Sequence, residues 1–177
     1  NYPYLDKKNL INIIEDNENI DFYFIGPRGR SNIYTNNIDT DLYKTLMKLN
    51  NFIFLGSKDS LDLPKYINQF DLFLICYDSD KYTKEVANPH KLLEYLSTGK
   101  TIVSHYIDEY NGMKDLVQMA NSNSELPELF SKIVNNIQFY NSRQLNNIRI
   151  KYAKTHTYSN NLKIIDSHIN EIKQNSI

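Results

Sequence analysis

Residues 71–104 read DLFLICYDSDKYTKEVANPHKLLEYLSTGKTIVS, and this stretch predicts a strand–helix–strand unit. Residues 71–76 form an almost unbroken apolar run, which is typical of a parallel strand covered on both faces. Helical periodicity follows in residues 90–97, and Gly99 stands where a helix end favours glycine. A short strand at residues 101–104 completes the unit.

The same alternation of strands and helices extends toward the N-terminus. Apolar periodicity predicts a helix around residues 10–14, a strand at 20–26, a helix at 39–49, a strand at 51–56 and a helix at 61–70. Pro64 fits the last helix only in its first turn. Downstream, residues 116–120 are a candidate strand, and the pattern is then helical alone at 126–140, 142–155 and 159–173.

This succession predicts an α/β fold, a Rossmann-like doubly wound parallel sheet flanked by helices and finished by C-terminal helices. We find no internal repeat and no low-complexity linker in the 177 residues. A single domain over residues 1–177 is therefore expected.

Composition excludes several classes of protein. Lys and Arg number 20 against 21 Asp and Glu, a net charge of -1, which argues against broad electrostatic binding to nucleic acid. The single cysteine, Cys76, excludes an internal disulfide and fits a reducing compartment. No apolar run approaches ~18 residues and no signal-peptide pattern is present, so we expect no transmembrane segment and a cytoplasmic location.

Candidate binding residues lie in the loops that follow the predicted strands, after Gly26, Gly56 and Cys76. The third loop leads to Lys91 and Glu94, which share one helix face at a spacing of three. The free N–H groups at that helix start suit a phosphate, and a lysine beside a carboxylate can bind diphosphate and sugar hydroxyls. The alternative, a solvated ion pair on a surface helix, stays open at this stage.

Several motifs in this order resemble a known family. They are Phe54-Leu55-Gly56, Leu63-Pro64-Lys65-Tyr66, the strand at 71–76, Asn88-Pro89-His90-Lys91-Leu92-Leu93-Glu94-Tyr95-Leu96, and the Gly99 to Val103 stretch. The chain is similar to the C-terminal, donor-binding domain of GT-B fold bacterial glycosyltransferases, of the family 4 or group 1 kind that build surface polysaccharides.

The resemblance implies transfer of a sugar from a nucleotide-diphosphate sugar to a saccharide or lipid-linked acceptor. It implies that Lys91 contacts the donor diphosphate and that Glu94 contacts the ribose hydroxyls. The other implied donor-binding residues are Asn88 and His90 in the motif, Leu92 and Leu93 through backbone N–H groups, Ser57 and Lys58 near the nucleobase, and Arg28 near the phosphates.

The resemblance also implies that no metal and no cofactor is needed, so Asp78-Ser79-Asp80 is interpreted as a solvent-facing loop and not as a metal motif. We expect the chain to be one half of a GT-B enzyme whose N-terminal acceptor domain is absent, and to be inactive alone. Peripheral membrane association of the full-length protein stays open. So does the stereochemical outcome, because Val86 stands eight positions before Glu94, where retaining members often carry glutamate.

Two other readings of the sequence stay open. The chain can be a non-catalytic flavodoxin-like nucleotide-binding or regulatory module, although Asp71 begins its strand where a receiver domain needs an aspartate at the strand end. It can also be a scaffold with a degenerate donor site. His105, directly after a predicted strand, is a further candidate for lining the cleft.

Overall fold

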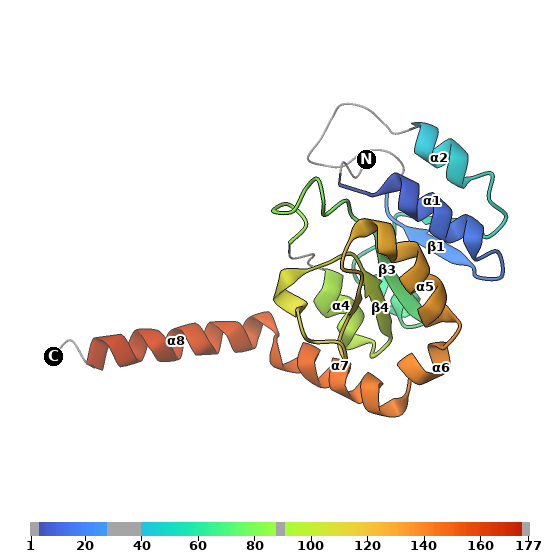
Figure 1. Ribbon diagram of the computed structural model, residues 1–177. Coiled ribbons are helices and arrows are strands. Elements are labelled where there is room, and N and C mark those ends of the chain that lie inside the picture. Colours follow the sequence, from blue (N-terminus) through green and yellow to red (C-terminus); the bar gives the residue numbers. More distant parts are fainter. Residues whose placement is uncertain (1–3, 28–39, 88–90, 175–177) are drawn as a thin grey trace.

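The computed structural model describes residues 4–27, 40–87 and 91–174, and these form an α/β structure with parallel strands. The strands are β1 (Phe22–Ile25), β2 (Phe52–Gly56), β3 (Leu72–Ile75), β4 (Thr101–Ser104) and β5 (Gln118–Met119). The α-helices are α1 (Lys7–Asp16), α2 (Thr40–Leu46), α3 (Leu63–Ile67), α4 (Lys91–Ser97), α5 (Leu126–Val134), α6 (Ile137–Tyr140), α7 (Arg143–Thr155) and α8 (Tyr158–Gln174). Two 3-10 helices, η1 (Asp108–Tyr110) and η2 (Asn123–Glu125), lie on either side of β5. The order of elements agrees with the sequence prediction (Figure 1).

The strands are divided between two small sheets. β1 pairs with β2, and β3, β4 and β5 form the second sheet in that order, with every pairing parallel. The backbone at the carboxyl end of β3 instead pairs with the segment before α1, through an antiparallel bridge between Leu5 and Tyr77. The parallel α/β expectation is thus confirmed, whereas the described residues do not form the expected continuous sheet.

Both faces of β3 and β4 are covered, as the apolar run at residues 71–76 predicts. Phe73 and Ile75 pack into a core with side chains of α4 and α7, and Leu72 and Leu74 face a second core built by α1, β1 and α5. Successive residues of a strand point to opposite faces. A strand between two helix layers therefore needs apolar residues at every position.

Helix α4 is held at its buried face and at its end. Leu92 and Leu96 are buried in the core, and α4 packs against α7. Gly99 follows with φ at 76°, in the left-handed region that favours glycine at a helix C-terminus. A Cβ at Gly99 would lie 3.1 Å from the Asn146 carbonyl oxygen, so the close approach of α7 also requires glycine.

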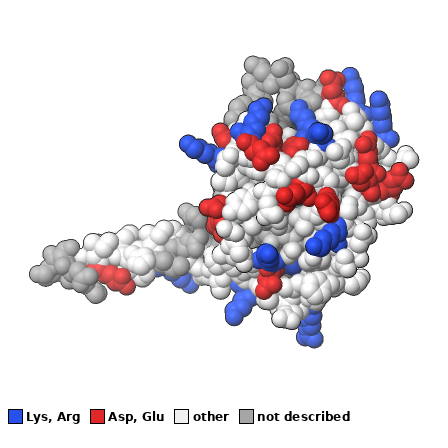
Figure 2. All heavy atoms as spheres, in the orientation of Figure 1, with Lys and Arg blue, Asp and Glu red and all other residues white. Residues whose placement is uncertain are grey.

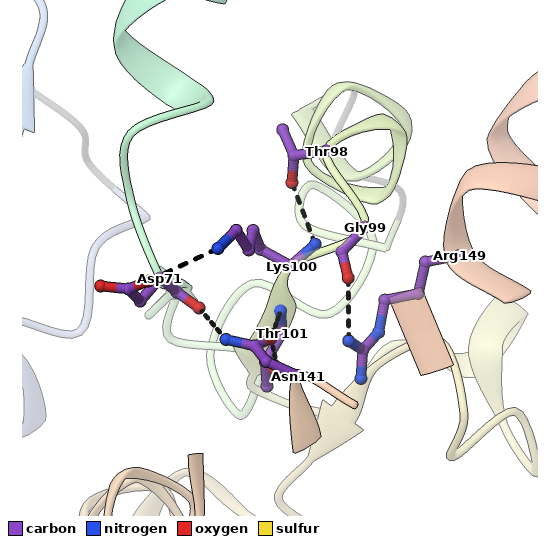
Figure 3. A network of polar contacts seen from close by, with 7 residues as sticks. All are labelled: Asp71, Thr98, Gly99, Lys100, Thr101, Asn141 and Arg149. Atoms are coloured by element: carbon purple, nitrogen blue, oxygen red, sulfur yellow. Dashed lines mark hydrogen bonds and ion pairs between the residues drawn. The ribbon is translucent and has the colours of Figure 1, made fainter. Parts of the chain in front are cut away.

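Polar contacts join the end of α4 to β3, α6 and α7 (Figure 3). The Arg149 guanidinium, fully buried, donates from Nη1 to the carbonyl oxygens of Gly99 at 3.0 Å and Tyr140 at 2.9 Å. The Asn141 side chain donates to the Asp71 carbonyl at 2.7 Å and accepts from the Thr101 backbone at 2.9 Å. These contacts fix where β3 and β4 begin relative to the helices behind them.

The predicted helix at residues 126–140 is wrong in one respect, because the structure divides it into α5 and α6. The break lies at Asn135 and Asn136, where Asn135 caps α5 and the Asn136 side chain donates to the Lys132 carbonyl at 3.0 Å. Asparagine side chains compete for backbone hydrogen bonds in this way and favour helix ends.

Helix α8 projects from the rest of the chain in Figure 1. Its Leu162, Ile165, Ile169 and Ile172 are exposed. On the face shown in Figure 2, acidic and basic side chains are intermixed over the main body. Within residues 4–27, 40–87 and 91–174, none of the helices combines the length and hydropathy that a bilayer crossing requires.

Candidate functional site

A cavity of about 1720 Å³ lies between the two sheets. Residues 22–25 of β1 and 72–75 of β3 both line it, together with side chains that follow the carboxyl ends of the strands. Those side chains are Pro27 after β1, Ser57 and Lys58 after β2, Tyr77 after β3, and Lys91 and Glu94 of α4. The cavity also reaches Lys100 and Asn141 near the opposite ends of β3 and β4. Four of the predicted site residues, from two distant segments of sequence, therefore meet at one cavity.

Lys91 and Glu94 occupy the first turn of α4. By accessible area both side chains are exposed, yet enough protein surrounds Lys91 to lower the pKa of its ammonium by desolvation, while the nearby Glu94 carboxylate opposes that shift. Because burial of Leu92 and Leu96 fixes the rotation of α4, the opposite face of the helix carries this charged pair. The pair is thus a cation and an anion on one wall of the cavity.

Ser57 and Lys58 are placed by the end of β2. Gly56 has φ at 71°, which turns the chain out of the sheet, and its carbonyl accepts a hydrogen bond from the Gly26 N–H at 3.0 Å. The Lys58 ammonium lies 4.8 Å from the centre of the Tyr66 ring, a cation–π contact. This contact holds a second cation at the cavity on a different element from Lys91.

The other predicted site residues either lie outside the described residues or have side chains that do not line the cavity. Arg28, Asn88 and His90 lie outside the described residues. The Leu92 side chain is buried in the core, and Leu93 is 37% exposed without lining the cavity. The proposed phosphate contact of these two leucines is through backbone N–H groups, and it stays a prediction.

The expectation for His105 is wrong. The ring is fully buried and does not line the cavity. Instead its Nε2 lies 3.4 Å from the Val86 carbonyl oxygen and its Nδ1 lies 3.3 Å from the Ser104 hydroxyl. Burial lowers the pKa of the His105 ring, and the carbonyls of Ile75 and Val86, which would accept hydrogen bonds from the charged ring, oppose that shift. The ring is therefore a neutral internal group at neutral pH.

The sequence analysis missed a polar cluster beside the cavity. The buried Asn123 side chain donates to the Asp6 carboxylate at 2.8 Å and to the Tyr77 carbonyl at 2.7 Å, and it accepts from the Ser79 hydroxyl at 2.6 Å. Asp6 also caps α1 by accepting from the Asn9 backbone at 3.1 Å. An aspartate just before a helix is a local capping signal. The link to Asn123, more than 100 residues away, has no local signal.

The aspartates of the Asp78-Ser79-Asp80 motif and the single cysteine are not arranged as a metal site. Asp78 accepts from the Lys81 backbone at 3.1 Å, which closes a turn, and Asp80 is exposed. Cys76 is buried, as the sequence predicts, and burial raises the pKa of its thiol far above the usual range. In the described part of the chain, no group of three or more His, Cys, Asp or Glu side chains is arranged to hold a metal ion.

A scan against protein-family models and a search of curated proteins both find no match to this chain.

Proposed function

We propose that the chain is the donor-binding part of a glycosyltransferase of the GT-B kind, which binds a nucleotide-diphosphate sugar in the cavity between β1 and β3. The observation that carries this proposal is that Lys91 and Glu94 line the same cavity as Ser57 and Lys58. Both pairs of residues follow the carboxyl ends of strands, β2 and β3, where a ligand of a parallel sheet is expected. The transfer, to a saccharide or lipid-linked acceptor, belongs to the synthesis of cell-surface polysaccharide.

The chemistry of the reaction and the resemblance to GT-B donor-binding domains together assign a role to each side chain. Glycosyl transfer breaks the bond between the anomeric carbon and the diphosphate oxygen, so negative charge develops on the leaving group. The Lys91 ammonium stabilises that charge, and the Glu94 carboxylate accepts hydrogen bonds from the ribose hydroxyls. Ser57 and Lys58 lie against the nucleobase. No metal is required for these roles.

The arrangement of strands supports a binding site at this position. β1 and β3 line the same cavity without pairing, and β1 pairs with β2 while β3 pairs with β4, so the direction in which successive strands are added reverses at the cavity. Ligands of open parallel sheets bind outside the carboxyl ends of the strands at such a reversal. The end of β1 with Pro27 and the loop after β3 that leads to α4 flank this point.

The direct test is a calorimetric titration of the chain with UDP, GDP and their sugars. We expect saturable binding of one of the two nucleotides with a Kd of about 1 mM or below, which corresponds to about 4 kcal/mol. Inorganic phosphate at the same concentrations serves as the control and should compete only weakly. A chain that binds neither nucleotide at millimolar concentration would not have the proposed function.

Glu94→Gln is expected to weaken binding of the preferred nucleoside diphosphate by about fivefold, because an amide accepts ribose hydroxyls less strongly than a carboxylate. The loss should disappear with the 2′,3′-dideoxy form of the same nucleotide, which offers no hydroxyls to Glu94. Glu128→Gln on α5 is the matched control, since Glu128 is exposed and does not line the cavity. If Glu94→Gln weakens binding of the ribose form and of the dideoxy form equally, Glu94 does not contact the ribose hydroxyls.

A further inference from the structure

The buried His105 ring joins three segments beside the cavity. It follows β4, its Nδ1 lies 3.3 Å from both the Ser104 hydroxyl and the Ile75 carbonyl oxygen, and its Nε2 lies 3.4 Å from the Val86 carbonyl oxygen. The Tyr77 ring packs beside it, with centroids 5.5 Å apart. The imidazole thus connects the ends of β3 and β4 to the loop between β3 and α4.

Each ring nitrogen faces a carbonyl oxygen, and we assign the proton to Nε2 from the partners that remain. Val86 offers Nε2 only a carbonyl oxygen, so a hydrogen bond there requires the proton on Nε2. Nδ1 can then accept from the Ser104 hydroxyl, while the Ile75 carbonyl already accepts the backbone N–H of His105 at 3.2 Å. A neutral ring protonated on Nε2 therefore satisfies its neighbours without a buried charge.

Residues 77–87 are anchored separately at their two ends. Asn123 holds the first end through the Tyr77 carbonyl and the Ser79 hydroxyl. At the second end the Val86 side chain is buried, and its carbonyl faces His105. Tyr77, at the first end, lines the cavity and packs beside the His105 ring.

From this geometry we infer that His105 is a positioning residue, whose Nε2–H bond to Val86 fixes the end of the 77–87 loop and, together with the Tyr77 ring packed beside it, the part of the cavity that Tyr77 lines. The effect on nucleotide affinity rests on the proposed function. The effect on the loop does not, because it concerns the chain without any ligand.

The test compares two variants whose amide groups differ in reach, because only one of them places a donor where Nε2 lies. The amide nitrogen of His105→Gln reaches the place of Nε2 and can still donate to Val86, whereas the shorter amide of His105→Asn cannot. Amide hydrogen exchange over residues 77–87 in the nucleotide-free chain should stay within twofold of the parent for His105→Gln and accelerate about fivefold or more for His105→Asn. Tyr106→Phe, which removes an exposed hydroxyl directly after His105 and none of the ring's contacts, is the matched control and should leave this exchange unchanged.

With UDP or GDP as the probe, His105→Asn should raise the Kd about five- to tenfold, and His105→Gln should restore it. If His105→Asn does not fold, His105→Phe, which keeps a ring without either nitrogen, takes its place. Equal loop exchange in the Gln and Asn variants would overturn the inference. If the parent chain binds no nucleotide but loop exchange is still faster in His105→Asn than in His105→Gln, the anchor is supported and only the proposed function is rejected.

Discussion

Replacing Arg149 with alanine should lower the free energy of unfolding by about 3 kcal/mol, the largest stability effect that we expect from a single side chain here. Arg149 is completely buried, and its Nη1 donates to two carbonyl oxygens at the ends of neighbouring helices. Tyr140 is the last residue of α6, and Gly99 lies two residues after the end of α4. Helix carbonyls at such ends have no partner within the helix, so a buried cation there satisfies them and also complements the helix dipoles.

The guanidinium carries a cost as well as a gain. Burial lowers the pKa of Arg149 to about 10, with Asp115 opposing the shift, so the group is still charged at neutral pH. In the described part of the chain its Nε and Nη2 atoms have no hydrogen-bond partner. For a buried cation that is only partly hydrogen-bonded, the cost of desolvation offsets part of the free energy gained from its hydrogen bonds.

Arg149→Met separates these contributions. Methionine fills most of the same volume and brings no charge, so we expect a loss of about 1–2 kcal/mol, between the parent and Arg149→Ala. Arg143→Ala is the matched control on the same helix, since Arg143 is exposed and its loss should cost less than about 0.5 kcal/mol. Urea denaturation followed by circular dichroism gives all three values. A loss below 1 kcal/mol for Arg149→Ala would show that the two carbonyls do not depend on this side chain.

The elements that the sequence predicted best are those specified by local chemistry. The strand at residues 101–104 and the turn at Gly99 were predicted at the residues where they occur. Pro64 lies in the first turn of α3, as its missing N–H requires. The helix at residues 126–140 was predicted too long because two asparagines in the middle were not treated as a helix end.

Contacts between distant residues could not be predicted from the sequence. Strand pairing depends on packing between segments that are far apart in the sequence. The division into one sheet of β1 and β2 and another of β3, β4 and β5 therefore has no local signal. His105 was read as a cleft residue because it follows a strand, and only the fold shows that its ring is enclosed by Val86 and Tyr77. Nothing in the sequence around Arg149 signals that its guanidinium is buried. By contrast, the three-residue spacing of Lys91 and Glu94 was enough to place them on one face of α4.

Lys91→Ala should weaken the binding of UDP or GDP by about 10- to 100-fold, the largest effect on ligand binding that we expect. The loss follows from removing a charge-assisted contact to the diphosphate, so the corresponding monophosphate should be affected less. Lys132→Ala is the matched control, because Lys132 is an exposed side chain of α5 that does not line the cavity. A calorimetric Kd for UDP within twofold of the parent value would remove Lys91 from the site.

The pH dependence of binding provides an independent check on the same side chain. Desolvation lowers the pKa of Lys91 below that of an ordinary lysine, and Glu94 only partly offsets this. The ammonium is present below its pKa and lost above it, so nucleotide affinity should fall as the pH rises, beginning at a lower pH than an ordinary lysine would produce. Lys91→Arg keeps the positive charge at every accessible pH, and its binding should therefore show no such fall. If the parent and Lys91→Arg lose affinity in parallel, a group other than Lys91 titrates, and the assignment of the diphosphate contact to this ammonium is wrong.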